Sequence, residues 1–331
     1  MNDVKTIVQK ALDGVELDGD EVAALFDAPL FSMDSACILA TARKLSERAS
    51  NGSAEVHAQI GLNIAPCPCN CKFCAFAACN GVFTESSELP VEEAVSAAKI
   101  FEQDGANGIF LMGTADYPFS RFVEVAQEVR RALLPETVMV ANVGDFDKAE
   151  AKKLKDAGFA GIYHAIRLGE GRDTKLDPKR RLETFQNARE AGLHLGTCLE
   201  PVGTEHSTAE LVEKTLITRD AGPVYSGSAR RIPIPGTEMA RLGIVSEARM
   251  AHILAVVRLA VGLSVPGNCT HEPNVIGAAA GANFFWAEVG SNPRDSVKDT
   301  KDARGKTVTW CRNVLEEAEW KVLNGPSMIY G

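Results

Sequence analysis

Short apolar runs alternate with longer amphipathic stretches along most of this chain. Near-continuous apolar runs bounded by turn residues predict strands that are buried on both faces, as in a parallel sheet. The intervening stretches repeat apolar side chains every three or four residues, which predicts helices. Examples of the runs are GIFLM at 108–112, TVMVANV at 137–143, AGIYHA at 160–165 and FFWAEV at 284–289, and VEEAVSAAKIFEQDG at 91–105 is one of the helical stretches.

A weak internal repeat supports this alternation. Several predicted helices end in an acidic or small residue followed by glycine, which supplies the left-handed backbone just past a helix end. The gaps between these glycines are roughly one or two multiples of 30 residues, the size of a β-α unit. With HAQIGLNI at 57–64 as the first strand, the pattern predicts about eight strands. The glycines are Gly105, Gly158, Gly192, Gly222 and Gly281.

Strands that alternate with helices predict an α/β fold with a parallel sheet. About eight units favour a closed (β/α)8 TIM-type barrel, and an open doubly wound sheet is the alternative that the pattern leaves. We expect residues 1–54 to form a helical N-terminal extension, residues 55–290 the barrel, and residues 291–331 a C-terminal loop and helix that close it. The active groups of such a barrel lie in the loops that follow its strands.

Composition narrows the class of protein. The 331 residues carry a formal net charge of −9 and contain no basic tract, which argues against nucleic acid and anionic membranes as partners. The N-terminus lacks the apolar core of a signal peptide, and no apolar run is long enough to span a bilayer. We therefore expect a cytoplasmic protein. Nine cysteines in a reducing compartment favour metal or catalytic chemistry over a disulfide framework.

Four of the cysteines lie in the segment CPCNCKFC, directly after the first predicted strand. Cys67, Cys69, Cys71 and Cys74 together could complete a compact zinc site. A thioredoxin-like redox pair is a second interpretation, although such a pair opens a helix. In a third, Cys67, Cys71 and Cys74 hold a [4Fe–4S] cluster and leave one iron open to a small molecule. Cys69 and the following Cys79 are then spare thiols that are inert or serve as a fourth ligand.

The third interpretation coincides with a known pattern. The spacing Cys67-x3-Cys71-x2-Cys74, with the aromatic Phe73 before the last cysteine, resembles the signature of the radical S-adenosylmethionine (radical SAM) superfamily. The resemblance implies that the open iron binds the amino and carboxylate groups of S-adenosylmethionine (SAM). It also implies that one electron from the cluster cleaves the sulfonium and yields a 5′-deoxyadenosyl radical. A barrel interior would shield this radical from water and competing hydrogen donors.

Over residues 20–290 the chain resembles the biotin synthase branch, with its [FeFe]-hydrogenase maturase and methylornithine synthase relatives. The resemblance implies that Arg181, in KRRLETFQNAREAG, pairs with the carboxylate of SAM, as suits a guanidinium fork. It further implies that FLMGT, with Met112, Gly113 and Thr114, presents backbone groups to the SAM ammonium. In the segment HLGTCLEPVGTEHS it implies a turn that packs on the adenosine.

Two further cofactor contacts follow from the same resemblance. The segment RIPIPGTEM at 231–239 resembles the sixth-strand motif of the branch, which implies that Ile234 lies near the adenine. The loop after the fourth strand is several residues shorter than is usual in the branch. That loop normally supplies a ribose ligand, and Glu170 is the candidate for it here.

Biotin synthase uses a second cluster, with cysteines from its second, third and fifth strands. Here the second and third predicted strands contain no cysteine, and Cys198 is close to the fifth. The final turn, PGNCTHEPN, brings Cys269, His271 and Glu272 to the mouth of the barrel. We therefore take Cys198, Cys269 and His271 as catalytic candidates, which either ligate a second metal centre or supply a hydrogen atom.

Polar residues near other strand ends indicate the chemical class of the substrate. Arginines gathered at one rim of an acidic protein favour a carboxylate-bearing substrate. The alternative is that each arginine pairs with a neighbouring acid, such as Glu200 or Glu205. The residues concerned are His164, Arg167, Arg230 and Arg231.

These observations predict a radical SAM enzyme that abstracts hydrogen from a small, carboxylate-bearing substrate. Rearrangement or fragmentation in cofactor or amino-acid biosynthesis would follow, under anaerobic conditions, with electrons from a low-potential donor such as ferredoxin or flavodoxin. Sulfur insertion of the biotin or lipoyl synthase type, with a second cluster, is the alternative reaction. Alternatives of another class are a zinc-stabilised barrel that acts as a binding protein and an iron–sulfur protein that only carries electrons. Relatives are often dimers, so a homodimer is expected.

Overall fold

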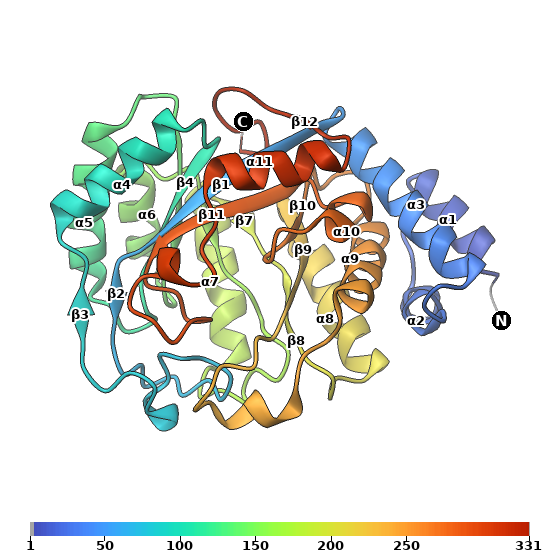
Figure 1. Cartoon of the computed structure of the whole chain (residues 1–331), viewed down its shortest axis with the longest axis horizontal. Coiled ribbons are helices and arrows are strands. Elements are labelled where there is room, and N and C mark those ends of the chain that lie inside the picture. Colours follow the sequence, from blue (N-terminus) through green and yellow to red (C-terminus); the bar gives the residue numbers. More distant parts are fainter. Residues whose placement is uncertain (1–2, 331) are drawn as a thin grey trace.

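The computed structural model describes residues 3–330, and a closed parallel barrel forms its centre (Figure 1). Neighbouring strands pair in parallel around the ring, and the last strand pairs with the first over seven residue positions from Glu55↔Phe284 to Gly61↔Gly290. This closure confirms the (β/α)8 barrel and excludes the open sheet. In order, the strands are β1 (Ser53–Gly61), β4 (Gly108–Met112), β5 (Val138–Asn142), β6 (Gly161–Tyr163), β7 (His194–Gly196), β9 (Tyr225–Arg230), β10 (Gly267–Thr270) and β11 (Phe284–Gly290), while β8 (Leu199–Val202) prolongs the β7 segment alongside β9.

Helices surround the barrel because alternate strand residues face outward. On β1, Val56, Ala58 and Ile60 belong to the apolar layer under the helices, whereas His57 and Gln59 alternate with them and face the interior. The helices are α4 (Val91–Gln103), α5 (Phe119–Ala132), α6 (Lys148–Asp156), α7 (Pro178–Glu190), α8 (Thr208–Asp220), α9 (Glu247–Val261), α10 (Val275–Ala279) and α11 (Val308–Glu317).

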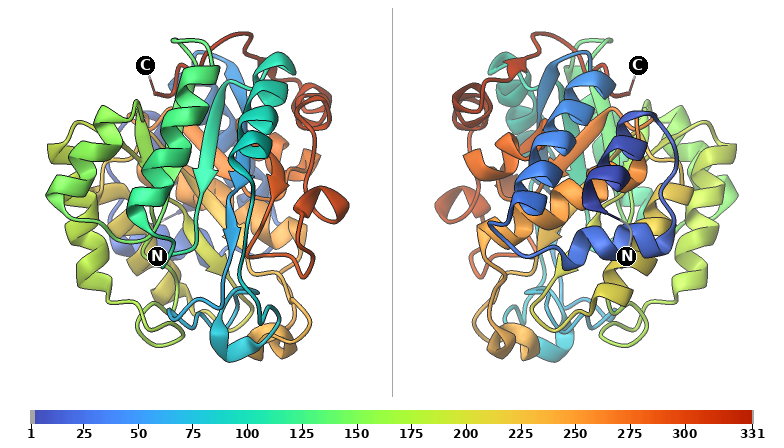
Figure 2. Two further views of the ribbon diagram at one scale, coloured as in Figure 1. Left: turned by 90° about the vertical axis from the view of Figure 1, so that its left-hand side faces the viewer. Right: turned by 90° about the vertical axis from the view of Figure 1, so that its right-hand side faces the viewer.

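Three N-terminal helices cover one side of the barrel, as the right-hand view of Figure 2 shows. They pack on α8 and α9 and form an apolar cluster separate from the one around β1. Because α9 lies between these helices and the barrel, every residue from Met250 to Val261 is buried. The three helices are α1 (Val4–Leu12), α2 (Gly19–Asp27) and α3 (Met33–Ala49).

The C-terminal segment fills the amino-terminal end of the barrel. After the short helix η3 (Thr300–Asp302) and α11, strand β12 (Lys321–Val322) pairs with the start of β1. The buried Glu55 carboxylate then accepts hydrogen bonds from the Met328 and Ile329 amides, at 2.8 and 3.2 Å. With this end filled, the carboxyl-terminal end of the barrel is left for a ligand.

Small elements frame the cysteine segment at that opposite end, at the lower edge of Figure 1. They are β2 (Asn63–Ile64), η1 (Ala78–Asn80), β3 (Ser87–Glu88) and η2 (Glu238–Leu242). Within residues 3–330, none of the helices combines the length and the apolar character needed to cross a bilayer.

Candidate active site

A cavity of about 170 Å³ opens at the carboxyl-terminal ends of the barrel strands. Its lining comes from almost every part of the ring, including Gln59 on β1, Asn142 on β5, Tyr163 on β6 and Ala229 on β9. Strand ends and the loops after them carry the reactive groups of barrels of this type. The cavity is therefore the candidate active site.

Four cysteines, Cys67, Cys69, Cys71 and Cys74, line one side of the cavity, together with Phe73. The loop that carries them is anchored to the loop after β6, because the Lys72 amide donates to the Asp173 carbonyl at 3.0 Å and the Lys175 amide donates to the Cys69 carbonyl at 2.8 Å. Cys79 is exposed and does not line the cavity. The structure thus brings the three predicted cluster ligands, and the spare Cys69, to one wall.

Burial keeps most of these thiols protonated in the protein alone. It raises the pKa of Cys71 to about 12 and that of Cys74 to about 11. The hydrogen bond between Cys67 and Cys69, together with burial, raises the pKa of Cys67 and the same hydrogen bond lowers that of Cys69. Metal binding replaces such protons, and soft thiolates are the ligands of iron–sulfur clusters. The donor set therefore fits a [4Fe–4S] cluster.

No group of three or more His, Cys, Asp or Glu side chains in residues 3–330 is arranged to hold a single metal ion. Cluster ligands, each of which bonds a different iron, need not converge in this way.

The end of β4 forms the neighbouring part of the lining, with Met112, Gly113 and Thr114. The Thr114 amide donates to Asn63 Oδ1 and the Gly113 amide donates to the Asn142 carbonyl, each at 2.9 Å. These N–H groups are used within the protein, and the Met112 and Thr114 carbonyls already accept the Leu62 and Tyr117 amides, at 2.8 and 3.0 Å. A ligand at the strand end would therefore meet carbonyl oxygens, with the Gly113 carbonyl between those two. Oxygen acceptors suit an ammonium group.

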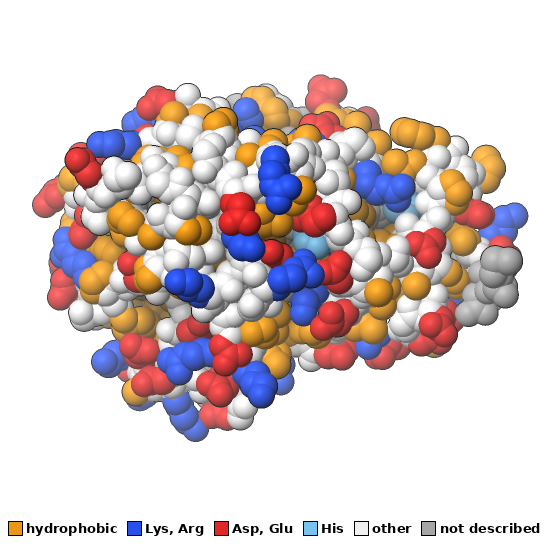
Figure 3. All heavy atoms as spheres, turned by 90° about the horizontal axis from the view of Figure 1, so that it is seen from below, with side chains coloured by type: hydrophobic (Ala, Val, Ile, Leu, Met, Phe, Trp, Pro, Cys, Tyr) orange, Lys and Arg blue, Asp and Glu red, His pale blue; other side chains and the backbone are white. Residues whose placement is uncertain are grey.

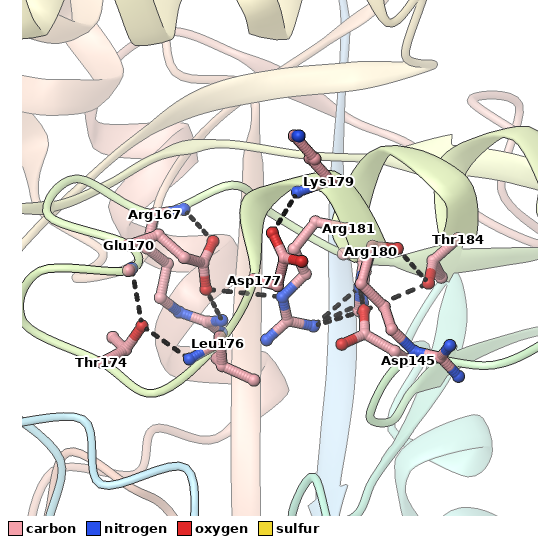
Figure 4. Close-up of polar contacts among 12 residues, drawn as sticks. Asp145, Arg167, Glu170, Thr174, Leu176, Asp177, Lys179, Arg180, Arg181 and Thr184 are labelled. Atoms are coloured by element: carbon pink, nitrogen blue, oxygen red, sulfur yellow. Dashed lines mark hydrogen bonds and ion pairs between the residues drawn. The ribbon is translucent and has the colours of Figure 1, made fainter.

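Arg181, on α7, lines the cavity and is held from behind by two acids (Figure 4). Its Nε donates to Glu170 at 3.4 Å and its Nη1 donates to Asp145 at 3.3 Å. In Figure 4 the second terminal nitrogen makes no dashed contact with the residues drawn. The arginine is thus oriented before any ligand binds, and one edge of its fork is available.

His164, at the end of β6, completes this network. Its Nε2 lies 2.7 Å from Arg181 Nη1 and 2.9 Å from Asp145 Oδ1. Burial and the Arg181 charge lower the pKa of His164 to about 4, so the imidazole is neutral near pH 7. Although burial opposes ionisation of Asp145, the His164 hydrogen bond and the Arg181 charge lower the pKa of Asp145 to about 2. Asp145 therefore stays charged beside Arg181.

Glu170 lies behind Arg181 and does not line the cavity. Its carboxylate is buried and also accepts the Arg167 amide, at 2.7 Å. The proposed contact of Glu170 with a ribose stays a prediction, and its position favours a supporting role for Arg181.

The rim arginines do pair with acids. Arg167 Nε lies 3.3 Å from Glu200. Arg230 pairs with Glu247 at 3.4 Å and with Glu272, and Arg231 pairs with Glu205. The interpretation that each of these arginines has an acidic neighbour is therefore correct.

Two arginines nevertheless keep free hydrogen-bond donors. Among the described residues, Arg231 Nε and Nη2 and Arg294 Nη2 are buried and have no hydrogen-bond partner, although Arg294 Nη2 lies 3.9 Å from Glu272. Arg231 is only 2% exposed, and both side chains line the cavity. Because unpaired buried donors are unfavourable, an anionic ligand would stabilise this wall.

The remaining predicted residues divide into two groups. Ile234 and His271 line the cavity, and His271 Nε2 lies 3.4 Å from Glu288. Cys198 and Cys269 do not line it, but their sulfurs lie 3.0 Å apart within the buried cluster in the barrel interior.

Sequence reasoning missed three residues of the site. Tyr163 ends β6, Asp145 follows β5 by three positions, and Arg294 follows β11 by four. Their position after a strand was the available signal. The sequence does not indicate which side chains in these loops turn toward the cavity.

Comparisons with known proteins agree with this geometry. Residues 66–217 match the family model described as the Radical SAM superfamily. The biotin synthase of Schizosaccharomyces pombe is 25% identical over 252 residues, which cover 69% of this chain and 67% of the relative. The biotin synthase of Hyphomonas neptunium is 27% identical over 257 residues, 72% of this chain and 76% of the relative.

Two solved structures share the fold. The FeFe-hydrogenase maturase HydG of Carboxydothermus hydrogenoformans superimposes with a TM-score of 0.78, at 20% identity, over 99% of this chain and 80% of that one. Methylornithine synthase (PylB) gives a TM-score of 0.77 at 18% identity and covers 98% of both chains. Identities this low show likeness of fold alone.

Proposed function

Because the chain belongs to the radical SAM superfamily, we propose that Cys67, Cys71 and Cys74 bind its [4Fe–4S] cluster and that SAM binds beside them in the cavity. Enzymes of this superfamily use these two cofactors, act on small molecules and need a reductant. When bound, the two cofactors supply a 5′-deoxyadenosyl radical that abstracts hydrogen from the substrate. The observation that carries the proposal is that the cysteines, Arg181 and the end of β4 line one cavity. The zinc-stabilised binding protein and the simple electron carrier have no such support.

The lining residues orient SAM by complementary chemistry. Arg181 binds the carboxylate through the edge of its fork that Glu170 and Asp145 leave available. Oxygen atoms at Met112, Gly113 and Thr114 accept the ammonium hydrogens. The other contacts that the resemblance implies are apolar, with Phe73 beside the cluster and Ile234 beside the adenine. Both apolar side chains exclude water from the reacting atoms.

The substrate is a small molecule that carries a carboxylate. The unpartnered nitrogens of Arg231 and Arg294 support this class, because a carboxylate would satisfy them. Abstraction of hydrogen from such a molecule leads to rearrangement or fragmentation within cofactor or amino-acid biosynthesis.

Sulfur insertion of the biotin synthase type is the second candidate reaction. It is favoured by the relatives that carry that name and by the adjacent thiols of Cys198 and Cys269, which could supply two ligands of a second cluster. The first reaction is preferred because β4 and β5 contain no cysteine.

Anaerobic reconstitution with iron and sulfide tests the cofactor assignment. We expect about four irons per chain, broad absorbance near 400 nm, and cleavage of SAM to 5′-deoxyadenosine when dithionite is added. The triple variant Cys67→Ala, Cys71→Ala, Cys74→Ala should lose all three properties, while the exposed Cys79→Ala variant should keep them. A colourless protein with one zinc per chain would overturn the proposal. Iron retained by the triple variant would support the second cluster.

A low-potential protein donor such as ferredoxin or flavodoxin supplies the electron in this proposal. Figure 3 shows the face that carries the cavity, where Lys and Arg side chains are interspersed with Asp and Glu. Such donors are acidic, so docking requires basic side chains on the surface that they contact. Turnover with a reduced flavodoxin in place of dithionite tests this donor.

The proposed homodimer is tested separately, by measuring the molar mass in solution with light scattering.

A further inference from the structure

A pair of buried thiols lies inside the barrel. Cys198 lies between β7 and β8, directly before Leu199, Cys269 is on β10, and their sulfur atoms are 3.0 Å apart. A disulfide would require about 2.05 Å, so both are free thiols in close contact. Strand β9 runs between these segments, and its residue opposite Cys269 is Gly227. Because Gly227 has no side chain, the Cys269 backbone packs directly against β9 at this position.

The surroundings of the pair favour intact S–H groups. Cys198 and Cys269 are 3% and 1% exposed, and they pack among Tyr225, Phe284 and Trp286. In such a setting the thiolate is unfavourable, and burial raises the pKa of Cys198 well above its ordinary value. Thiolate chemistry is therefore disfavoured here, while the weak S–H bond remains a source of hydrogen atoms.

One side chain connects the thiols with the cavity. Tyr163 belongs to the same interior cluster as both cysteines and also lines the cavity, which they do not. Tyr163 is therefore the side chain through which the cluster that holds Cys198 and Cys269 reaches the cavity.

We propose that Cys198 and Cys269 form a hydrogen-atom donor for the substrate radical and that Tyr163 relays the atom. This inference rests on the proposed radical SAM function. The substrate radical takes the hydrogen atom of the Tyr163 hydroxyl, which forms a C–H bond and leaves a tyrosyl radical. The tyrosyl radical takes the hydrogen atom of the Cys198 S–H group, which restores Tyr163 and leaves a thiyl radical.

The second thiol stabilises this thiyl radical. The Cys269 sulfur lies 3.0 Å from the thiyl sulfur and keeps its proton, and its lone pair interacts with the half-filled orbital of the Cys198 sulfur. One electron from the low-potential donor and one proton then restore the Cys198 thiol. The net consumption is one electron and one proton for each hydrogen atom delivered, so the relay needs no reactant beyond the donor that the enzyme already requires.

Solvent deuterium provides a test that does not require the substrate. The reconstituted enzyme is exchanged overnight into D2O and given SAM and dithionite without substrate, and the 5′-deoxyadenosine is analysed by mass spectrometry. O–H and S–H hydrogens exchange with solvent, whereas C–H hydrogens do not. We expect the abortive product of the wild type to contain one deuterium taken from the Tyr163 relay. The Tyr163→Phe variant should lose the label from the 5′-deoxyadenosine that it forms. The Cys198→Ala variant should keep it for the first turnover only, because its tyrosyl radical is not restored.

Two matched variants control for structural damage. Tyr225→Phe removes the hydroxyl of the tyrosine stacked on Tyr163, and Cys311→Ala removes a buried thiol elsewhere, so both should keep the label. A wild-type product without deuterium, or equal label in every variant, overturns the relay and leaves the proposed function intact. Absence of 5′-deoxyadenosine from the wild type overturns both.

A second measurement uses the protein without its cofactors. Treatment with a thiol oxidant followed by peptide mapping should yield a Cys198–Cys269 disulfide as the main cross-link outside the cysteine loop, because the sulfurs are already in contact. In parallel, the iron content of the reconstituted protein is measured for each variant. Loss of iron from Cys198→Ala or Cys269→Ala, with Cys311→Ala unchanged, would assign the pair to a second metal centre and overturn the hydrogen-atom role.

Discussion

The Glu170 carboxylate accepts a hydrogen bond from Arg181 Nε at 3.4 Å and is buried behind it. Glu170 therefore orients Arg181 toward the cavity without lining the cavity itself. In this arrangement Arg181 would bind SAM, and Glu170 fixes the direction of the Arg181 guanidinium.

Glu170→Gln should weaken SAM binding by about tenfold, because Arg181 loses a charged partner that holds its fork in place. Iron content should not change. The dissociation constant of SAM, measured by titration of the reconstituted protein, checks this. Glu183→Gln, an exposed change on the same helix as Arg181, is the control. An unchanged SAM affinity would show that Arg181 needs no support from Glu170.

Arg294→Met should raise the free energy of unfolding by about 1 kcal/mol. Burial lowers the pKa of Arg294, and its ion pair with Glu272 spans 3.9 Å, so its charge is poorly compensated in the free protein. Glu272 keeps Arg230 and Arg304 as partners when Arg294 is replaced. Urea unfolding of the substrate-free protein gives the comparison. Arg241→Met, on the rim helix η2, serves as the control. A less stable Arg294→Met protein would mean that the guanidinium is already satisfied without an anionic ligand.

The stability of the wild type should fall as the pH decreases from about 6.5 toward 4. The folded-state pKa of His164 is about 4, below its ordinary 6.5, so in this window the unfolded chain binds a proton that the folded protein does not. This histidine contributes at most about 3 kcal/mol. Urea unfolding at several pH values should show a flatter dependence for His164→Asn.

The Asp145 carboxyl affects the stability of the fold at lower pH than His164 does. Its folded-state pKa of about 2 lies below its ordinary 3.8, so its contribution is complete above pH 3.8 and is lost as the pH falls through 2. The difference between wild type and His164→Asn above pH 4 therefore belongs to the histidine. Equal slopes for the two proteins would contradict the assignment of His164 as a buried neutral group.

Glu55→Gln should destabilise the fold by about 2 kcal/mol. The carboxylate accepts from the Met328 and Ile329 amides and lies 2.7 Å from His57 Nε2, so it joins the C-terminal segment to the barrel interior. Thermal unfolding measures the loss. The exposed change Glu316→Gln on α11 should have no effect, and an equal effect of both changes would show that Glu55 makes no specific contribution.

Much of the fold follows from local pattern. The apolar segments predicted at 57–64, 108–112, 137–143, 160–165 and 284–289 overlap the barrel strands β1, β4, β5, β6 and β11. Gly158 and Gly281, expected just past helix ends, have φ values of +91° and +105°. Such features are visible in sequence because periodicity and backbone preference involve residues close together in the chain.

The chemistry of the cysteine segment is equally local. The spacing of Cys67, Cys71 and Cys74 within one loop sufficed to indicate the cluster and, through the family resemblance, SAM. Roles that depend on contacts between distant loops were harder to assign from the sequence. Glu170 is predicted to bind a ribose, which stays a prediction, and the compact turn of its loop, in which the Asp173 amide donates to the Gly169 carbonyl at 2.7 Å, places it behind Arg181.

The sequence by itself determined the strand and helix order, the closed barrel as the favoured architecture and the cysteine motif, because each depends on residues near one another along the chain. Only the tertiary structure decided that β11 pairs with β1, that Arg231 and Arg294 keep unpartnered nitrogens, and that Cys198 meets Cys269 beneath Tyr163. These relationships join residues up to hundreds of positions apart. They depend on the register between strands and on the direction of each side chain, which local sequence pattern does not encode.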